Sequence, residues 1–294
     1  MRVLISGAGG LIGSELVSQL EADGHDVLKL VRRERQASDE YRWYPTAGVV
    51  DPGLIASVDA VVNFSGASIG RLPWTPGYKR EILRSRIDAT RTLADAIVSS
   101  EDPPAAFLNA SAVGYYGDRP GETLTEQSSR GSGFLADVTD AWEQAANLAV
   151  HSSRVVTFRT GVVVGQGGAF TPLGLLTKLG LGATIGAGSQ FWPWISLYDE
   201  AAAVRHLLTS TLSGPVNLAG PTPASAETVT TSLADAMHRW HPWAIPEPIV
   251  QLAMREPGRE LLLASQKMVP EKLVADGFEF RYPTVEAAIG AIWR

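Results

Sequence analysis

Three glycines near the start of the chain have the spacing of a phosphate-binding turn. Gly7, Gly10 and Gly13 follow the apolar residues 2–5 and precede residues 11–20, in which apolar side chains recur at helical spacing. The sequence therefore predicts a strand, a tight turn and a helix. The first glycine allows the turn, the second leaves room for a pyrophosphate, and the third lets the helix pack on the strand. The implied ligand is a dinucleotide.

The start of this helix would supply the rest of the phosphate site. The first N–H groups of a helix have no partner within it, and together with the helix dipole they attract an anion. We therefore expect the backbone at Leu11 and Ile12 to bind the cofactor with the three glycines. A glycine-rich turn without a ligand is the alternative, and the position directly between a strand and a helix argues against it.

Two arginines indicate which dinucleotide is bound. Residues 25–32 (HDVLKLVR) predict the second strand, and Arg32 and Arg33 lie at its end. An acidic residue there would accept a hydrogen bond from the adenosine ribose 2′-hydroxyl and favour NAD, whereas two cations suit a 2′-phosphate. The sequence thus predicts NADP. The alternative is that both arginines are solvated side chains of a surface loop.

Further cofactor contacts are expected after the next strand. Residues 59–64 predict a short apolar strand, and residues 79–98 predict a long helix. The turn after the strand holds three small residues, Ser65, Gly66 and Ala67. Ligands of open α/β sheets lie across the carboxyl ends of the strands, so this turn should face the cofactor. We expect Arg86 on the helix to reach a phosphate and Glu81 a ribose hydroxyl, with surface ion pairs as the alternative for both.

The composition excludes several classes of function. The chain has 294 residues, 45% of them hydrophobic, enough for a large core in one or two domains. A formal net charge of -6 and scattered Lys and Arg argue against nucleic acid as a partner. With no cysteine and no ligand spacing among its five histidines, the sequence predicts no metal site. It holds no apolar run of about 18 residues for a membrane span and no signal peptide, so we expect a cytoplasmic protein.

A second group of residues could move a proton. Residues 107–111 (FLNAS) predict a strand that ends in Ser111, and Tyr115 and Tyr116 follow in a turn. A serine hydroxyl can polarise a substrate oxygen, and a tyrosine hydroxyl can exchange a proton with it. These three side chains are the candidate catalytic residues.

A strand that ends in Ser and leads into a Tyr-Gly turn resembles the extended branch of the short-chain dehydrogenase/reductases, which includes nucleotide-sugar epimerases and dehydratases. Residues 159–165 (RTGVVVG) resemble the later strand of those enzymes, whose backbone passes the nicotinamide, and this implies a cofactor contact at Val162. Residues 191–199 (FWPWISLYD) resemble their W-I-x-x-x-D segment. The resemblance covers residues 1–220 in the order of that family.

A narrower resemblance covers the whole chain. The N-terminal GAGGLIG and the segments at 85–91, 134–146, 188–196 and 261–283 resemble an epimerase-like subgroup that ends in a C-terminal domain of unknown function. This implies an α/β fold, with a doubly wound parallel Rossmann sheet and a smaller, discontinuous α+β domain on the substrate side. We expect the NADP-binding domain to comprise residues 1–165 and 195–220, and the substrate lid and C-terminal domain to comprise residues 166–194 and 221–294.

One feature of the superfamily is missing. Hydride-transferring members use Tyr-x-x-x-Lys on the helix after the serine strand, where the Lys lowers the pKa of the Tyr and the Tyr exchanges a proton with substrate. The matching helix, residues 134–150, contains neither Tyr nor Lys. Tyr115 and Arg119 have the right interval, but neighbouring glycine and proline oppose a helix. Ser111 with Tyr115 or Tyr116 remains the candidate set, and an aromatic wall of the pocket is the alternative role of the tyrosines.

Two classes of function fit these observations. The first is an NADP-dependent oxidoreductase or epimerase-like enzyme that acts on a small nucleotide-linked or carbonyl substrate under a glycine-rich lid, residues 166–190. The second is a non-catalytic NADP(H)-binding redox sensor that regulates a partner, because the phosphate site is present and the acid/base pair is not. A homodimer through residues 79–98 and 134–150 is one expectation for assembly, and burial of both helices within one chain is the other.

Overall fold

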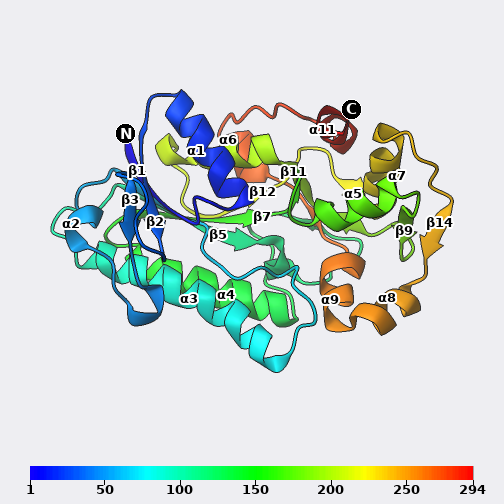
Figure 1. Ribbon diagram of the computed structural model, residues 1–294, viewed down its shortest axis with the longest axis horizontal. Helices are drawn as coiled ribbons and strands as arrows, with labels where there is room; N and C mark the ends of the chain where they lie inside the picture. Colours follow the sequence, from blue (N-terminus) through cyan, green and yellow to red (C-terminus); the bar gives the residue numbers. More distant parts are fainter. Residues whose placement is uncertain (294) are drawn as a thin grey trace.

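The computed structural model describes residues 1–293 and contains a central seven-stranded sheet between two layers of helices (Figure 1). All neighbouring strands are parallel, in the order β12-β7-β5-β4-β1-β2-β3. The strands are β1 (Arg2–Ser6), β2 (Asp26–Val31), β3 (Glu40–Arg42), β4 (Ala60–Asn63), β5 (Ala106–Ala112), β7 (Arg154–Thr160) and β12 (Gly214–Leu218). The strand order reverses between β1 and β4, so the predicted doubly wound Rossmann sheet is confirmed.

Each face of the sheet has its own helix layer and apolar core. One layer is α1 (Leu11–Ala22) and α6 (Leu197–Thr209), and the other is α3 (Pro76–Val98) and α4 (Phe134–Ala146) (Figure 1). Along β1, Val3 and Ile5 join the core under α1 and α6, while Leu4 joins the core under α3. Successive side chains of a strand point to opposite faces, and this explains why a strand covered on both sides is continuously apolar.

Local signals explain where the long helices begin and end. The Thr75 side chain accepts from the N–H of Tyr78 and Pro76 occupies the first turn, so α3 begins three residues before the predicted start at residue 79. The predicted helix 134–150 ends at Ala146 and continues as the 3₁₀ turn η3 (Asn147–Ala149). The shorter elements of this half are η1 (Pro45–Ala47), α2 (Pro52–Ile55), η2 (Val113–Tyr116) and β6 (Thr123–Leu124).

A smaller part lies beyond the carboxyl ends of the central strands (Figure 1). It has a core of its own that includes Phe170, Trp192, Trp194, Leu233 and Ile289. Its elements are β8 (Val162–Val164), α5 (Phe170–Lys178), β9 (Ala183–Ile185), β10 (Phe191–Trp192), β11 (Trp194–Ser196), β13 (Ala224–Ser225), α7 (Ala226–Ala236), β14 (Trp243–Ile245), α8 (Glu247–Met254), α9 (Glu256–Gly258), the π-helical turn η4 (Arg259–Leu263), β15 (Lys267–Met268), α10 (Glu271–Ala275) and α11 (Val285–Ile292). The short strands form two-stranded sheets, β10 with β13, β11 with β8, β14 with β9 and β15 with β6.

Two predictions that the sequence makes for this part are wrong. The proline-containing residues 242–248 predict a rigid linker, but they contain β14, which pairs with β9. Residues 249–263 predict a second helical stretch, but the chain leaves α8 at Arg255, which has a φ of 55°. Pro257 has no N–H to donate, so the hydrogen bonding of α8 could not have continued through it. The sequence also predicts Ser225 as a helix N-cap, and its side chain does cap α7 by accepting from the N–H of Thr228.

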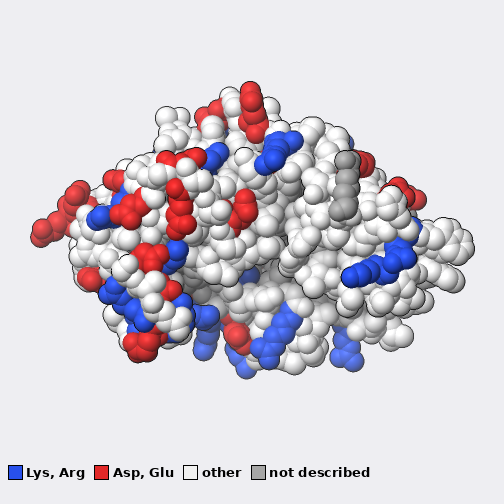
Figure 2. Space-filling model, turned by 45° about the horizontal axis from the view of Figure 1, so that its top comes forward, with Lys and Arg blue, Asp and Glu red and all other residues white. Residues whose placement is uncertain are grey.

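Charge is distributed unevenly over the surface. Figure 2 shows acidic and basic side chains intermixed at the end that carries β1 to β3, whereas the opposite end is mostly uncharged. Within residues 1–293 no helix is long and apolar enough to span a membrane. In the same range no three His, Asp or Glu side chains come together in a way that could bind a metal ion.

Candidate functional site

The glycine turn after β1 leaves no room for side chains. Gly7 has a φ of +76°, a conformation that other residues rarely adopt. The N–H of Gly10 donates to the carbonyl of Gly7 across 3.0 Å and closes the turn. A Cβ on Gly13 would lie 2.3 Å from the same carbonyl oxygen. The close approach of α1 to the turn therefore requires glycine at this position.

The N-terminus of α1 is open to a ligand. Gly10 is the residue before the helix, and no side chain caps its N-terminus. The first N–H groups of the helix, including those of Leu11 and Ile12, thus have no intrahelical acceptor. A Cβ on Gly9 would meet nothing within 4 Å, so the space above the turn is open. The turn lies between β1 and β4, where ligands of this sheet type bind, and it fits the pyrophosphate of a dinucleotide.

The two arginines after β2 have different environments in the structure. Arg33 donates two hydrogen bonds to Glu40 on β3, with N–O distances of 2.6 and 2.8 Å. The Arg33 guanidinium, together with the backbone N–H of Gln36, lowers the pKa of Glu40 to about 2. Arg32 is exposed, and no carboxylate within residues 1–293 pairs with it. Arg32 therefore has the guanidinium that is free to bind a phosphate.

Arg86 holds the turn after β4 in place. Its guanidinium donates to the carbonyl of Ala67 across 3.0 Å and stacks on the ring of Trp142. A Cβ on Gly66 would lie 3.1 Å from the Arg86 Cζ, so the turn and the arginine are in close contact. Burial lowers the pKa of Arg86 to about 10. The structure thus brings Arg86 to this turn, whereas Glu81 is exposed on the same helix.

The other residues expected near the cofactor also have defined contacts. The Ser65 hydroxyl donates to the Ser6 hydroxyl at the end of β1. The backbone N–H of Val162 donates to the carbonyl of Pro193, within the short pairing of β8 with β11. A Cβ on Gly167 would lie 2.9 Å from Leu11 Cδ1, so the start of the expected lid packs on the first residue of α1, next to the glycine turn.

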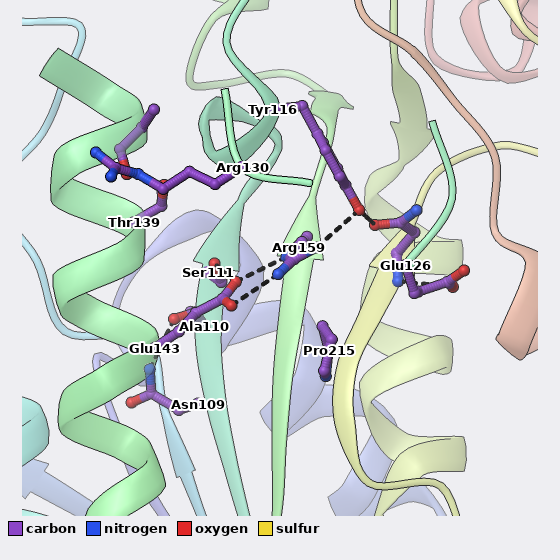
Figure 3. A network of polar contacts seen from close by, with 12 residues as sticks. Asn109, Ala110, Ser111, Tyr116, Glu126, Arg130, Thr139, Glu143, Arg159 and Pro215 are labelled. Atoms are coloured by element: carbon purple, nitrogen blue, oxygen red, sulfur yellow. Dashed lines mark hydrogen bonds and ion pairs between the residues drawn. The ribbon is translucent and has the colours of Figure 1, made fainter. Parts of the chain in front are cut away.

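A buried polar network lies beside the candidate catalytic residues (Figure 3). The Ser111 hydroxyl on β5 donates to Glu143 Oε1 on α4 across 2.6 Å. Arg159 on β7 donates to both oxygens of the same carboxylate, each across 2.8 Å. All three side chains are buried. Ser111 therefore points between β5 and α4, and its proton is already donated.

The two tyrosines of η2 differ in accessibility. Tyr116 is fully buried, and its hydroxyl accepts from Arg159 and lies 2.7 Å from Asn217 Oδ1. Burial raises the pKa of Tyr116. Tyr115 is half-buried, and the Arg159 Cζ lies 3.5 Å from the centre of its ring. Arg119 is paired with Glu122 instead, so the structure does not bring it together with Tyr115. Tyr115 is therefore the more accessible of the two side chains.

Sequence reasoning did not identify Glu143 and Arg159 as site residues. Both occur in segments that carried the family resemblance, at 134–146 and 159–165, but neither residue had a role assigned to it. The signal that could have found them is that both are charged residues in segments predicted to lie in or against the central sheet. A Glu or an Arg that is buried there must be paired.

The C-terminal part covers the turn η2, which carries the two tyrosines, and a cavity lies between that part and the turn. The Gln266 side chain donates to the carbonyls of Val113 and Gly117, at the two ends of the turn. The Glu260 carboxylate accepts hydrogen bonds from the first two N–H groups of α4, those of Phe134 and Leu135. A cavity of about 260 Å³ lies between these contacts, and its lining includes Gly114, Leu135 and Arg259. It provides room for a small molecule beside the turn that carries Tyr115.

Comparison with known proteins agrees with this geometry. The family model described as the NAD dependent epimerase/dehydratase family matches residues 3–220, the part that holds the glycine turn and the network. The chain belongs to this family. A second model, a domain of unknown function, matches residues 245–292. The resemblance inferred from the sequence is therefore confirmed for both parts of this epimerase/dehydratase family member.

Relatives extend over the whole chain. An epimerase family protein of Mycobacterium tuberculosis is 40% identical over 291 residues, 98% of this chain and 96% of its own. The crystal structure of the human epimerase family protein SDR39U1 with NADPH has a TM-score of 0.91 at 32% identity and covers 99% of both chains. A nucleoside-diphosphate sugar epimerase from Corynebacterium glutamicum has a TM-score of 0.80 at 32% identity, over 98% of this chain and 57% of its own.

Proposed function

We propose that this protein binds NADP(H) at the glycine turn and transfers hydride between the nicotinamide and a small carbonyl or hydroxyl substrate, as an oxidoreductase or epimerase-like enzyme. The observation that carries the proposal is the turn itself, where glycine is required at residue 13 and the N-terminus of α1 is uncapped. The human relative crystallised with NADPH supports the choice of cofactor. The relative named as a nucleoside-diphosphate sugar epimerase supports a nucleotide-linked substrate.

The cofactor would be held by residues of three segments. The turn and α1 would bind the pyrophosphate through backbone N–H groups, and Arg32 would bind the 2′-phosphate. The turn that contains Ala67 would face the cofactor, and Arg86 would hold it there through the hydrogen bond to the Ala67 carbonyl. When bound, NADPH supplies the hydride, and the protein must supply or remove one proton at the substrate oxygen.

Tyr115 is the residue that we assign to the proton. The hydroxyls of Ser111 and Tyr116 are engaged in the buried network, whereas Tyr115 is half-buried on the turn beside the cavity. The guanidinium of Arg159 faces the Tyr115 ring, so a positive charge lies against the side chain that would donate the proton. Glu143 holds that guanidinium with two hydrogen bonds. The ion pair thus provides a fixed cation where other family members use a lysine.

A non-catalytic NADP(H) sensor is the second candidate. The observation that favours it is the same network, because two of the three expected catalytic hydroxyls are hydrogen-bonded inside the protein. The two candidates agree on cofactor binding and differ in whether bound NADPH is ever oxidised.

Cofactor selectivity is tested by titrating the protein with NADPH and NADH and following tryptophan fluorescence. We expect NADPH to bind more tightly, and Arg32→Ala to weaken NADPH by about 10- to 100-fold, the worth of a charge-assisted hydrogen bond. Arg33→Ala should weaken it less, because that side chain is shared with Glu40. Arg35→Ala is the control for loss of a nearby positive charge. Equal affinity of the wild type for NADH and NADPH would contradict the assignment of Arg32.

Catalysis is tested by following NADPH oxidation with a panel of carbonyl compounds and nucleotide-linked sugars. We expect Tyr115→Phe to lower kcat by about 100-fold or more without changing NADPH affinity, because it removes one hydroxyl and leaves the ring on Arg159. An unchanged kcat in Tyr115→Phe would reject Tyr115 as the proton donor. Tight NADPH binding without oxidation by any compound would favour the sensor.

A further inference from the structure

Large apolar side chains are exposed at the end of the molecule farthest from β3. Two short segments, 175–181 and 240–252, hold half of the large apolar residues that are exposed in the described chain. We call these eight residues the terminal patch: Leu175, Leu176, Leu179, Leu181, Trp240, Trp243, Ile249 and Leu252. Trp240 is 80% exposed and Leu252 is 84% exposed. Monomeric proteins rarely expose so much apolar surface in one region without a binding partner.

The fold brings the two segments together. β9 and β14 pair in parallel, with Ala183 opposite Trp243 and Ile185 opposite Ile245. α5 leads into β9 and α8 follows β14, and all four elements lie at one end of the molecule (Figure 1). This is also the end that carries few charged side chains (Figure 2).

The exposed area suits an interface between two copies of this chain. The two tryptophans alone expose roughly 300 Å², at about 250 Å² for a full side chain, and the six aliphatic residues more than double that area. The total reaches the roughly 800 Å² that each partner buries in a standard-size interface. Aromatic residues are enriched and charged residues depleted at the centres of such interfaces.

The charge of the terminal patch favours a protein surface over a lipid surface. Only Lys178 and Glu247 carry a charge in the two segments, so the patch is neutral. Attraction to an anionic membrane would require a cluster of about 4 to 8 Lys or Arg. A neutral patch with one cation and one anion can meet its own copy without bringing only like charges together.

We propose that the terminal patch is the surface through which two copies of this chain associate. The dimer contact then lies on the substrate-side part and leaves α3 and α4 within each chain. Among the described residues, α3 exposes one large apolar side chain, Val98 at its end, and α4 exposes none, while Leu148 lies in the following turn η3.

The test is a measurement of molar mass by light scattering and analytical ultracentrifugation over a wide range of protein concentration. We expect the wild type to have twice the monomer mass, and Leu179→Glu with Trp240→Glu to raise the dimer dissociation constant by at least 100-fold. Both side chains are exposed, so the fold should survive, and this is checked by circular dichroism. Val98→Glu with Leu148→Glu is the matched control and should leave the dimer unchanged.

Three outcomes would overturn the proposal. The first is a wild type that remains monomeric at the highest concentration, and the second is a dimer that survives in the patch variant. The third is a monomer that sediments with phosphatidylcholine vesicles and loses this binding in the patch variant, which would identify a lipid surface as the occupant. A dimer lost only in the Val98 and Leu148 control would place the contact on α3 and α4 instead.

Discussion

Glu200 provides the sharpest test of the energetics of this fold. Its side chain on α6 is fully buried, and within residues 1–293 only one carboxylate oxygen has a partner, the Thr160 hydroxyl at 2.7 Å. Burial raises the pKa of Glu200 from 4.5 to about 8. At neutral pH the folded protein therefore keeps a proton on this group, whereas the unfolded chain has released it.

The sign and size of the effect follow from proton linkage. Between pH 4.5 and 8 the folded state binds more protons than the unfolded state, so stability falls as the pH rises through this window and levels off above it. At about 1.36 kcal/mol per pH unit, the whole window corresponds to about 5 kcal/mol. From pH 5 to pH 8 the expected loss is about 4 kcal/mol, on the same scale.

Glu200→Gln isolates this contribution, because the amide keeps the shape and an acceptor for Thr160 but does not titrate. Urea unfolding at pH 5, 6, 7 and 8 gives the free energy of unfolding of both proteins, and their difference cancels the other titrating groups. We expect the difference to move by about 4 kcal/mol in favour of the variant as the pH rises. Glu286→Gln makes the same substitution at an exposed site on α11 and is the control. A difference that is constant with pH, or that favours the wild type as the pH rises, would refute the reasoning.

Three further substitutions test the site and its support. Gly13→Ala should lower the melting temperature in thermal scans and abolish NADPH binding, because the added Cβ has no room. Gly9→Ala is the control and should leave the melting temperature unchanged, because its Cβ would point into open space. Glu143→Gln should cost about 3 to 5 kcal/mol in urea unfolding, because it leaves the charge of Arg159 buried and unpaired. Asp199→Asn should lower the free energy of unfolding by about 1 to 3 kcal/mol and speed proteolysis of the C-terminal segment. The buried Asp199 carboxylate accepts hydrogen bonds from two backbone N–H groups of that segment, those of Arg281 and Tyr282.

The cofactor half of the fold could be predicted from local sequence signals. Three glycines at fixed spacing between an apolar strand and a helix have few other uses, and the apolar strands that follow define a parallel sheet. The signal was too weak at β3, whose three residues Glu40–Arg42 are mostly polar and form an edge strand. The pairing of Arg33 with Glu40 depends on that strand, so the sequence could not separate Arg33 from Arg32.

The substrate-side part was predicted less well because its short elements are held by distant contacts. The seven strands described for this part have two or three residues each, and they form four pairs between segments far apart in the sequence. The π-helical turn places Glu260 on the N-terminus of α4, more than 120 residues earlier in the chain. Hydrophobic periodicity records none of these contacts, since it reports only the neighbours within a few turns. The division of the chain into two domains at the expected boundaries stays a prediction.

The absence of a Tyr-x-x-x-Lys pair was visible in the sequence, but the contacts from which we propose a role for Tyr115 and Arg159 were not. Ser111 shares the face of β5 that points to α3 and α4, where the buried carboxylate of Glu143 needs hydrogen-bond donors. Arg159 supplies two of them and is in turn fixed close to the Tyr115 ring. A cation fixed against a phenol can assist proton transfer whether it comes from the same helix or from a neighbouring strand. Under the proposed function, catalysis should therefore depend on the buried ion pair as well as on the tyrosine that it faces.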